Sequence, residues 1–385
     1  MNPLWKQVIK HNVAIVAGVG AMLTAGASIG WAQAPQGEPI KIGAVLSLAG
    51  PGAGLGHPER NGILLAEKTI NARGGVKGRP IKVIIEDDGS KPDEAKSKAE
   101  KLIFQEKVVA MIGPSLTAST GAIGAITNAE GMAQLSFTGL GPKIELTYKS
   151  LYHVLPPQEL NARAMLEYTT KALKGKKVGV LHDTGYGQAV TNSLNSLKGE
   201  FGVEFVSVEK FEVGASDTSA QAAKVRASNP DVVFIIATSP VPFRNARQVK
   251  ITQPIVSAIG SATYDYVRGM GEFADDIVFP EFLVGEDPKP QQADFVKLYQ
   301  QTYNSVPKNF DAAGWDAVHI VAKAIETVGL NATRQDIAKA IRQPYTGVMA
   351  QYNFAAPDMT GIELPSFIYS KLVKGKFTRL PFTAK

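Results

Sequence analysis

The sequence predicts an α/β protein built from two lobes, each a doubly wound parallel sheet, joined by three crossovers of the chain. Short apolar runs alternate with segments of helical periodicity, a pattern typical of parallel sheets covered by helices. The same alternation starts again near residue 177, so the chain has two similar halves. Its 385 residues also exceed what one compact core supports and favour about two domains.

The first half contains four expected strands separated by helices. A buried strand, Ile40–Leu46, runs into a glycine-rich loop, and a helix is expected to begin at Pro58, because proline is favoured where helices start. That helix is expected to end at the pair Gly74 and Gly75. The later elements of this half are a strand at 81–86, a helix near 94–107, a strand at 108–112, a helix near 119–128 and a strand at 132–136.

The second half repeats this order of strand and helix. Its first strand, Lys177–Leu181, is followed by the loop sequence HDTGYG and by a helix with Val190, Leu194 and Leu197 on one face. The later elements are strands near 205–208, 231–237 and 255–258, a helical block after residue 288 with a long helix at 312–328, and a short strand at 367–371.

Three breaks in the pattern are the expected crossings between the lobes. They lie at 155–157, 279–280 and 345–348, and the first two contain proline. Lobe 1 is therefore expected to comprise residues 38–155 with 281–347, and lobe 2 residues 156–280 with 348–385. Doubly wound sheets bind ligands at the carboxyl ends of their strands, so the cleft between the lobes is the expected ligand site.

Residues 1–32 have the features of a secretory signal peptide. Lys6 and Lys10 form a basic start, residues 13–29 are apolar, and the small residues Ala32 and Ala34 follow. Cleavage is expected after Ala32. A retained membrane anchor is the alternative, but the apolar stretch is shorter than the ~20 residues that a bilayer requires. The sequence therefore predicts an exported protein.

Two segments at expected strand ends have polar or flexible character. The loop Gly50–Gly56 is expected to bring backbone N–H groups and a helix start to the cleft, which favours a negative ligand group. A tight connection is the alternative, since glycine permits positive φ in both cases. The acidic run at 86–88 could form a carboxylate cluster of a glycosidase or a metal site. A strand ending in a polar turn explains it more simply.

Composition and motif spacing restrict the possible chemistry. With 44% hydrophobic and 20% charged residues the chain has ordinary globular composition, and its net charge of +6 is not gathered into the basic stripe typical of nucleic-acid binders. It has no cysteine, which excludes disulfides and thiolate chemistry. The histidines have no partner at metal-ligand spacing, and no acid–base pair or nucleophile motif is recognisable. We therefore expect no metal, no cofactor, no nucleic-acid partner and no enzymatic activity.

The sequence resembles the branched-chain amino acid (Leu/Ile/Val)-binding proteins. The stretch from Ile42 to Asp88 looks like their opening, and AMIGPSLTAST, QLSFTGLGP, VGVLHDTGYGQ, DVVFIIATSP and NFDAAGWDAVHIVAKAIETVG follow in order, so the similarity spans nearly all of residues 38–372. Those proteins are extracytoplasmic receptors of ABC importers with the type I periplasmic binding fold. The resemblance implies a monomeric solute-binding protein of the periplasm that delivers a small ligand to an inner-membrane permease.

The resemblance also implies which residues hold the ligand. In the family, hydroxyl groups and backbone amides of the first lobe bind the ligand carboxylate, and neutral donors suit a desolvated carboxylate that must later be released. By motif these positions are Ser115, Leu116, Thr117, Thr138, Gly139 and Leu140. In the second lobe, Tyr186 matches an aromatic residue that closes over the ligand, and Ser239 lies at the next loop. Helix capping is the alternative role of Ser115 and Thr117.

One position departs from the family pattern. Amino-acid binders of the family place a carboxylate in the second lobe to pair with the ligand's ammonium group, and here that position falls on Ser261 or Ala262. An ammonium group buried without a partner costs several kcal/mol. The departure therefore favours an aromatic or other organic carboxylate. Aromatic residues that could line an apolar slot for it are Tyr186, Phe243, Tyr264 and Tyr266.

Two other functions stay open. A branched-chain amino acid or an amide is the alternative ligand, if Asp183 or Asp265 reaches the cleft. An exported hydrolase that uses the same cleft is the alternative from another class, although it would require a base close to a nucleophile.

Overall fold

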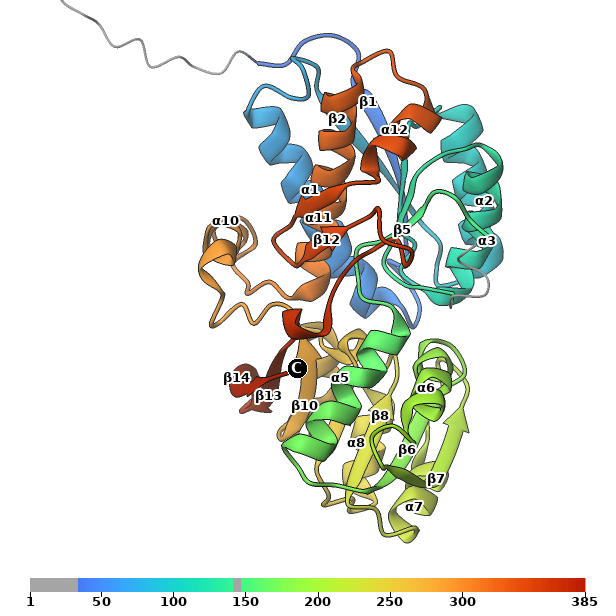
Figure 1. The fold of residues 1–385 in the computed structure, drawn as a ribbon, viewed down its shortest axis with the longest axis vertical. Coiled ribbons are helices and arrows are strands. Elements are labelled where there is room, and N and C mark those ends of the chain that lie inside the picture. Colours follow the sequence, from blue (N-terminus) through green and yellow to red (C-terminus); the bar gives the residue numbers. More distant parts are fainter. Residues whose placement is uncertain (1–33, 141–146, 385) are drawn as a thin grey trace, which may run out of the picture. The chain divides into compact units, whose positions relative to one another are not determined.

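Two large sheets organise residues 34–140 and 147–384, the part of the chain that the computed structural model describes (Figure 1). The predicted signal peptide, residues 1–32, lies outside the described residues. Among the described helices, none is both long and apolar enough to cross a membrane.

The N-terminal sheet is entirely parallel, with the strand order β2-β1-β3-β4-β5. Its strands are β1 (Ile40–Leu46), β2 (Ile81–Asp87), β3 (Met111–Ile112), β4 (Gln134–Ser136) and β5 (Leu151–His153). Its main helices are α1 (Ala53–Ala72), α2 (Pro92–Glu100), α3 (Thr117–Ala129), α11 (Asn309–Val328) and α12 (Arg334–Ile341).

Helices cover both faces of this sheet, as a doubly wound fold requires (Figure 1). Successive side chains of a strand point to opposite faces of the sheet, so the residues of β1 show what covers each face. Ile42 and Leu46 pack in the cluster that contains Ile63 of α1, whereas Val45 packs in a separate cluster with Ala99 of α2 and residues of α3. The predicted α/β fold class is confirmed.

The C-terminal sheet has the strand order β14-β13-β10-β9-β8-β6-β7. Its parallel strands are β6 (Lys177–Asp183), β7 (Glu204–Phe211), β8 (Val232–Ile236), β9 (Ile255–Ser257) and β10 (Ile277–Glu281). Two antiparallel strands, β13 (Ile368–Val373) and β14 (Lys376–Thr383), extend one edge. The helices of this half are α5 (Gln158–Lys171), α6 (Tyr186–Leu197), α7 (Ser219–Ala227), α8 (Val241–Gln248) and α9 (Tyr264–Met270).

The chain passes between the two sheets after β5, after β10 and before β13. The smaller elements α10 (Ala293–Tyr303), β11 (Pro344–Thr346) and β12 (Gln351–Asn353) belong to the connecting segments. The residue boundaries of the two lobes stay a prediction.

Helix α1 differs from its predicted extent, since it begins at Ala53 and Pro58 lies inside it. Two of the glycines that were expected to form a loop, Gly54 and Gly56, instead lie in the helix and allow it to approach its neighbours closely. A Cβ atom at Gly56 would lie 2.0 Å from the carbonyl oxygen of Ser47, and one at Gly54 would lie 2.4 Å from the ring of Tyr266. The helix therefore starts directly after a short turn, and the expected extent of the loop, Gly50–Gly56, is wrong, whereas its affinity for a negative ligand group stays a prediction.

Four further elements differ from the predictions. Strand β10 occupies a segment that was expected only as a break, because its proline suggested a turn. Strand β5 lies just before the expected break at 155–157, in a segment for which no element was expected. The helix expected near 94–107 is α2 followed by a π-helical segment, Lys101–Gln105. The short final strand is one half of the hairpin formed by β13 and β14.

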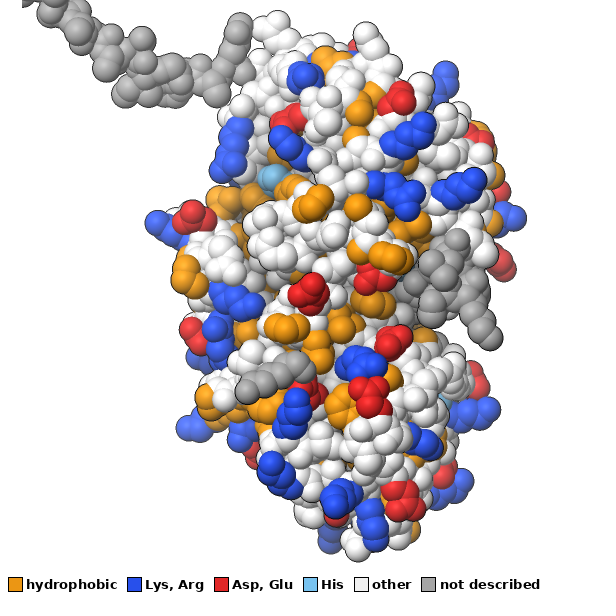
Figure 2. Space-filling view, viewed as in Figure 1, with side chains coloured by type: hydrophobic (Ala, Val, Ile, Leu, Met, Phe, Trp, Pro, Cys, Tyr) orange, Lys and Arg blue, Asp and Glu red, His pale blue; other side chains and the backbone are white. Residues whose placement is uncertain are grey.

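Charged side chains of both signs are intermixed on the face of the molecule shown in Figure 2. This distribution agrees with the alternation of acids and bases along the sequence. On this face, the net positive charge is not concentrated in one region.

Candidate functional site

A cavity of about 200 Å³ lies where strand ends of both sheets converge. On the N-terminal side it is lined by residues that follow β2, β3, β4 and β5, among them Ser90, Ser115 and Thr138. On the C-terminal side it is lined by residues that follow β6, β7, β8 and β9, among them Tyr186 and Thr238. The cavity thus occupies the position that parallel α/β sheets use for ligands.

Hydroxyl groups dominate the polar lining on the N-terminal side. Thr117 begins α3 and its Oγ1 lies 2.9 Å from Oγ1 of Thr138, so one of these hydroxyls donates to the other. The N-cap of α3 is Leu116, and no side chain caps this helix. The alternative in which Ser115 or Thr117 merely caps the helix is therefore wrong.

Tyr186 lies opposite, at the first position of α6. Burial raises the pKa of its phenol, so the group stays neutral, and its oxygen accepts from the N–H of Gly260 at 3.4 Å. The ring lies directly over Gly260, where a Cβ atom would come within 2.5 Å of it. The missing side chain at Gly260 therefore makes room for the tyrosine in the cavity wall.

Asp183 positions the turn that carries Tyr186. Its Oδ1 accepts from the N–H groups of Gly185 at 3.0 Å and Gly187 at 2.7 Å, and its Oδ2 accepts from the N–H of Thr238 at 2.9 Å and from its hydroxyl at 3.3 Å. Burial raises the pKa of this carboxyl, and these hydrogen bonds oppose that effect. Because Asp183 is occupied in this way and does not line the cavity, it is not placed to pair with a ligand ammonium group.

Five residues that the sequence suggested line the cavity: Ser115, Leu116, Thr117, Thr138 and Tyr186. Gly139 does not line it, although its carbonyl accepts from Nε2 of the lining residue Gln158 at 3.1 Å. Leu140 lies beside Gly121 of α3. A ligand-binding role for any of these residues stays a prediction.

The remaining suggested residues lie elsewhere. Ser239 lines a separate groove and its hydroxyl accepts from the N–H of Val241. Ser261 is buried and donates to the carbonyl of Ala237, and Ala262 and Phe243 are buried in the core. Tyr264 packs edge-on against Phe377. The expected aromatic slot built from Phe243, Tyr264 and Tyr266 is therefore absent from the cavity lining, which keeps only Tyr186 of that set.

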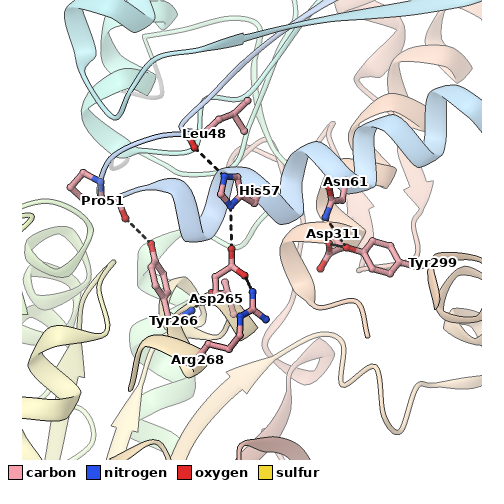
Figure 3. A network of polar contacts seen from close by, with 10 residues as sticks. Leu48, Pro51, His57, Asn61, Asp265, Tyr266, Arg268, Tyr299 and Asp311 are labelled. Carbon is pink, nitrogen blue, oxygen red and sulfur yellow. Dashed lines mark hydrogen bonds and ion pairs between the residues drawn. The ribbon is translucent and has the colours of Figure 1, made fainter. Parts of the chain in front are cut away.

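Asp265 and Tyr266 instead connect α9 to the start of α1, and so join the two halves of the chain (Figure 3). Nδ1 of His57 lies 3.3 Å from Oδ2 of Asp265, and Nε2 of His57 lies 3.0 Å from the carbonyl oxygen of Leu48. Asp265 also pairs with Arg268. The hydroxyl of Tyr266 donates to the carbonyl oxygen of Pro51 at 3.2 Å. These contacts explain why Asp265 does not reach the cavity.

Polar residues that sequence reasoning missed also line the cavity. Asn161 and Gln158 come from the first turn of α5, and Ser90, Ser119 and Thr238 complete the set. Asn161 is buried, with Nδ2 at 3.5 Å from the carbonyl oxygens of Pro156 and Pro157, whereas its Oδ1 has no hydrogen-bond partner among the described residues. Ser90 and Thr238 follow strand ends closely, and the other three lie near the starts of helices that follow strands; this position was the available signal.

Two buried carboxyl groups lie behind the lining hydroxyls. Oδ1 of Asp88 accepts from the hydroxyl of Ser47 at 2.7 Å, and its Oδ2 accepts from that of Ser119 at 3.1 Å. Glu59 of α1 forms a hydrogen bond with Ser115. Burial raises the pKa of both acids, and that of Glu59 reaches about 8. Asp88, the last acid of the run at 86–88, therefore supports the loops beside the cavity. No group of acidic, His or Cys residues in the described part of the chain is arranged to hold a metal ion.

The comparison with known sequences identifies one family. Residues 39–368 match the family described as periplasmic binding protein. An amino acid binding protein of Pseudomonas aeruginosa is 25% identical over 356 residues, which cover 88% of this chain and 92% of that protein. The Leu/Ile/Val-binding protein homolog 3 of Brucella melitensis is 24% identical, with 92% of this chain and 96% of that protein covered.

Solved structures show the same fold. The branched-chain amino acid transporter substrate binding protein LivJ of Streptococcus pneumoniae, in complex with isoleucine, matches with a TM-score of 0.81 and 26% identity, over 88% of this chain and 98% of its own. An ABC transporter solute binding protein of R. palustris in complex with benzoate matches with a TM-score of 0.80 and 20% identity, over 89% and 96%. This chain belongs to the periplasmic binding protein family and has the type I fold of the branched-chain amino acid-binding proteins.

Proposed function

We propose that this protein is the periplasmic substrate-binding protein of an ABC importer, and that it captures a small organic carboxylate between its two sheets. The observation that carries the proposal is the composition of the cavity wall. Neutral hydroxyl groups of Ser115, Thr117 and Thr138 lie on one side and Tyr186 on the other. Neutral donors of this kind satisfy a carboxylate by hydrogen bonding.

The ligand that this wall suits best lacks an ammonium group. No Asp or Glu is among the described residues that line the cavity, so an α-ammonium group would lose its water without gaining a counter-charge. An aromatic or other organic acid avoids this cost. The benzoate complex of the R. palustris protein supports this choice, whereas the isoleucine complex of the LivJ protein and the names of the relatives support a branched-chain amino acid as the second candidate.

Ligand binding is expected to favour a closed arrangement of the two halves, because the cavity takes its lining from both sheets. The closed form would then be the one that docks on an inner-membrane permease. Residues 1–32 would direct export to the periplasm.

A thermal-shift panel tests the choice of ligand. It contains benzoate, phenylpropanoid acids, leucine, isoleucine and short-chain amides. A bound ligand at a hundredfold excess over Kd stabilises the native state by about 2.7 kcal/mol, which raises Tm measurably. We expect organic acids to raise Tm and leucine to have little effect. Stabilisation by leucine alone would establish the amino-acid alternative, and turnover of any compound would contradict a pure binding function.

A further inference from the structure

Ser115 is held by two partners in addition to lining the cavity. Its oxygen accepts from the backbone N–H of Ser47 at 3.0 Å, and it forms a hydrogen bond with Oε2 of Glu59. Glu59 is fully buried, and its other oxygen, Oε1, has no partner among the described residues. A buried carboxyl group with so few hydrogen-bond partners favours its neutral form, because the ionised form is poorly stabilised.

The ionisable groups that surround Glu59 disfavour its ionisation further. Asp88 follows β2 and Asp311 belongs to α11, and both repel a negative charge on Glu59. Tyr266 of α9 faces the same region and stays a neutral phenol, because burial and the nearby acids Asp183, Glu59 and Asp265 raise its pKa. On α1 itself, His57 pairs with Asp265. Burial is the largest cause that raises the pKa of Glu59 to about 8, so the group holds a proton at neutral pH.

The protonation state of Glu59 decides what Ser115 offers to a ligand, because a hydroxyl group has a single proton. Beside an ionised Glu59, Ser115 must donate that proton to the carboxylate and can present only lone pairs to the cavity. Beside a neutral Glu59, the carboxyl O–H donates to Ser115. With that proton on Oε2 the contact runs from Glu59 to Ser115, the reverse of the direction that an ionised Glu59 requires. The oxygen of Ser115 then accepts from Glu59 and from the N–H of Ser47, and its own proton is free for the cavity.

We propose that Glu59 is a positioning residue, which as a neutral carboxyl group turns the Ser115 proton toward the ligand carboxylate. This inference rests on the proposed function, because it takes the ligand to be an anion. Ser119 provides the contrast within the same wall. It already donates to Asp88, so its hydroxyl can act toward a ligand only as an acceptor.

Calorimetric titration of the purified protein with benzoate and with leucine tests the proposal. Benzoate has no group that titrates near neutral pH. For the wild type we expect benzoate affinity to fall about tenfold between about pH 6.5 and about pH 9, as the neutral fraction of Glu59 declines. Glu59→Gln keeps a neutral donor of the same shape, so at both pH values it should bind benzoate as tightly as the wild type does at the lower pH. A wild-type affinity that does not change with pH, or loss of binding in Glu59→Gln, would overturn the proposal.

Two further variants separate the positioning role from other effects. Ser115→Ala should bind benzoate at about pH 6.5 as weakly as the wild type does at about pH 9, with little further change. A full tenfold fall in Ser115→Ala would instead indicate direct repulsion by Glu59 and overturn the role of Ser115. Asp316→Asn alters another buried acid, one outside the cavity lining, and should keep the wild-type pH dependence of affinity.

Thermal unfolding without ligand provides an independent readout. The pKa of Glu59 rises from 4.5 to about 8 on folding, so its stabilising effect is complete below the lower value and is lost as the pH rises through the upper one. The difference between the Tm of Glu59→Gln and that of the wild type should therefore shift in favour of the variant as the pH rises to about 8, and should stay constant above that pH. A difference in Tm that does not change with pH would show that Glu59 is ionised in the native protein and would overturn the proposal. If neither probe binds at any pH, the proposed function fails, while this melting series still decides the state of Glu59.

Discussion

Asn161 lies in the first turn of α5 and lines the cavity between the sheets. Its amide nitrogen faces two proline carbonyl groups, which leaves Oδ1 as an acceptor without a partner among the described residues. A buried acceptor without a partner costs about 1–3 kcal/mol. A ligand that donates a hydrogen bond to Oδ1 would recover this free energy, so Asn161 is a candidate determinant of specificity.

Replacing Asn161 by leucine keeps a similar shape and removes the acceptor. We expect Asn161→Leu to weaken binding of a phenylpropanoid acid that carries a phenol hydroxyl by about tenfold or more, measured by calorimetry, and to leave benzoate, which has no donor, unaffected. Thr169→Val is the matched control. Thr169 is also buried on α5 and its hydroxyl also has no partner, but it does not line the cavity, so its replacement should leave affinity unchanged. Equal affinity in Asn161→Leu and the wild type would contradict the role of Asn161.

Helices α1 and α11 cross at two glycines, and this crossing determines where Glu59 lies. A Cβ atom at Gly62 would lie 1.9 Å from the carbonyl oxygen of Asp311, and one at Gly314 would lie 2.3 Å from that of Glu59. Backbone is thus packed directly on backbone. Any side chain at the crossing would push α1 away from α11 and move the carboxyl group behind the cavity.

A methyl group at the crossing should therefore destabilise the protein. We expect Gly314→Ala to lower the free energy of unfolding by about 1–3 kcal/mol, the usual range for overpacking, in urea titrations followed by circular dichroism. The control is Gly199→Ala, because a Cβ atom at Gly199 would meet nothing within 4 Å and its φ is not positive. Similar stability of the two variants would show that the helices can separate without cost.

Contacts between α9 and the start of α1 link the two halves of the chain in this structure (Figure 3). The contact between His57 and Asp265 is partly exposed, and such polar contacts contribute little. The bond from the buried Tyr266 to the carbonyl of Pro51 is better shielded from water. These contacts favour the arrangement in which the cavity is lined from both sides, so we expect ligand binding to be coupled to them.

Removing one hydroxyl group tests this coupling. We expect Tyr266→Phe to weaken binding of the best panel compound about threefold to tenfold, the effect of one hydrogen bond, with little change in Tm. Tyr369→Phe is the control, since the hydroxyl of Tyr369 donates at 2.9 Å to the carbonyl of Ala164 within the C-terminal half. It should lower Tm without changing affinity. If Tyr266→Phe lowered Tm without changing affinity and Tyr369→Phe weakened binding, a role for Tyr266 in closure would be excluded.

Sequence patterns predict much of this architecture because strands and helices leave local periodic signals. The main strands of both sheets and the placement of Thr117, Thr138 and Tyr186 beside strand ends could be anticipated in this way, the residues through family motifs. The start of α1 could not, because glycine is a loop signal in sequence and here serves a close helix contact. Strand β10 was missed because its proline resembles a turn, and no element was expected where β5 lies.

The amino-acid order therefore carries the α/β class, the two sheets and the edge at which a ligand is expected, since these follow from local periodicity and chain direction. It does not show which polar side chains meet there. The partners of Asp183, the occupied carboxylate of Asp265, the exposure of Asn161 to the cavity and the burial of Glu59 behind Ser115 all depend on segments distant in the chain. Burial and hydrogen-bond partners, which set both pKa and ligand chemistry, exist only once those segments are packed together.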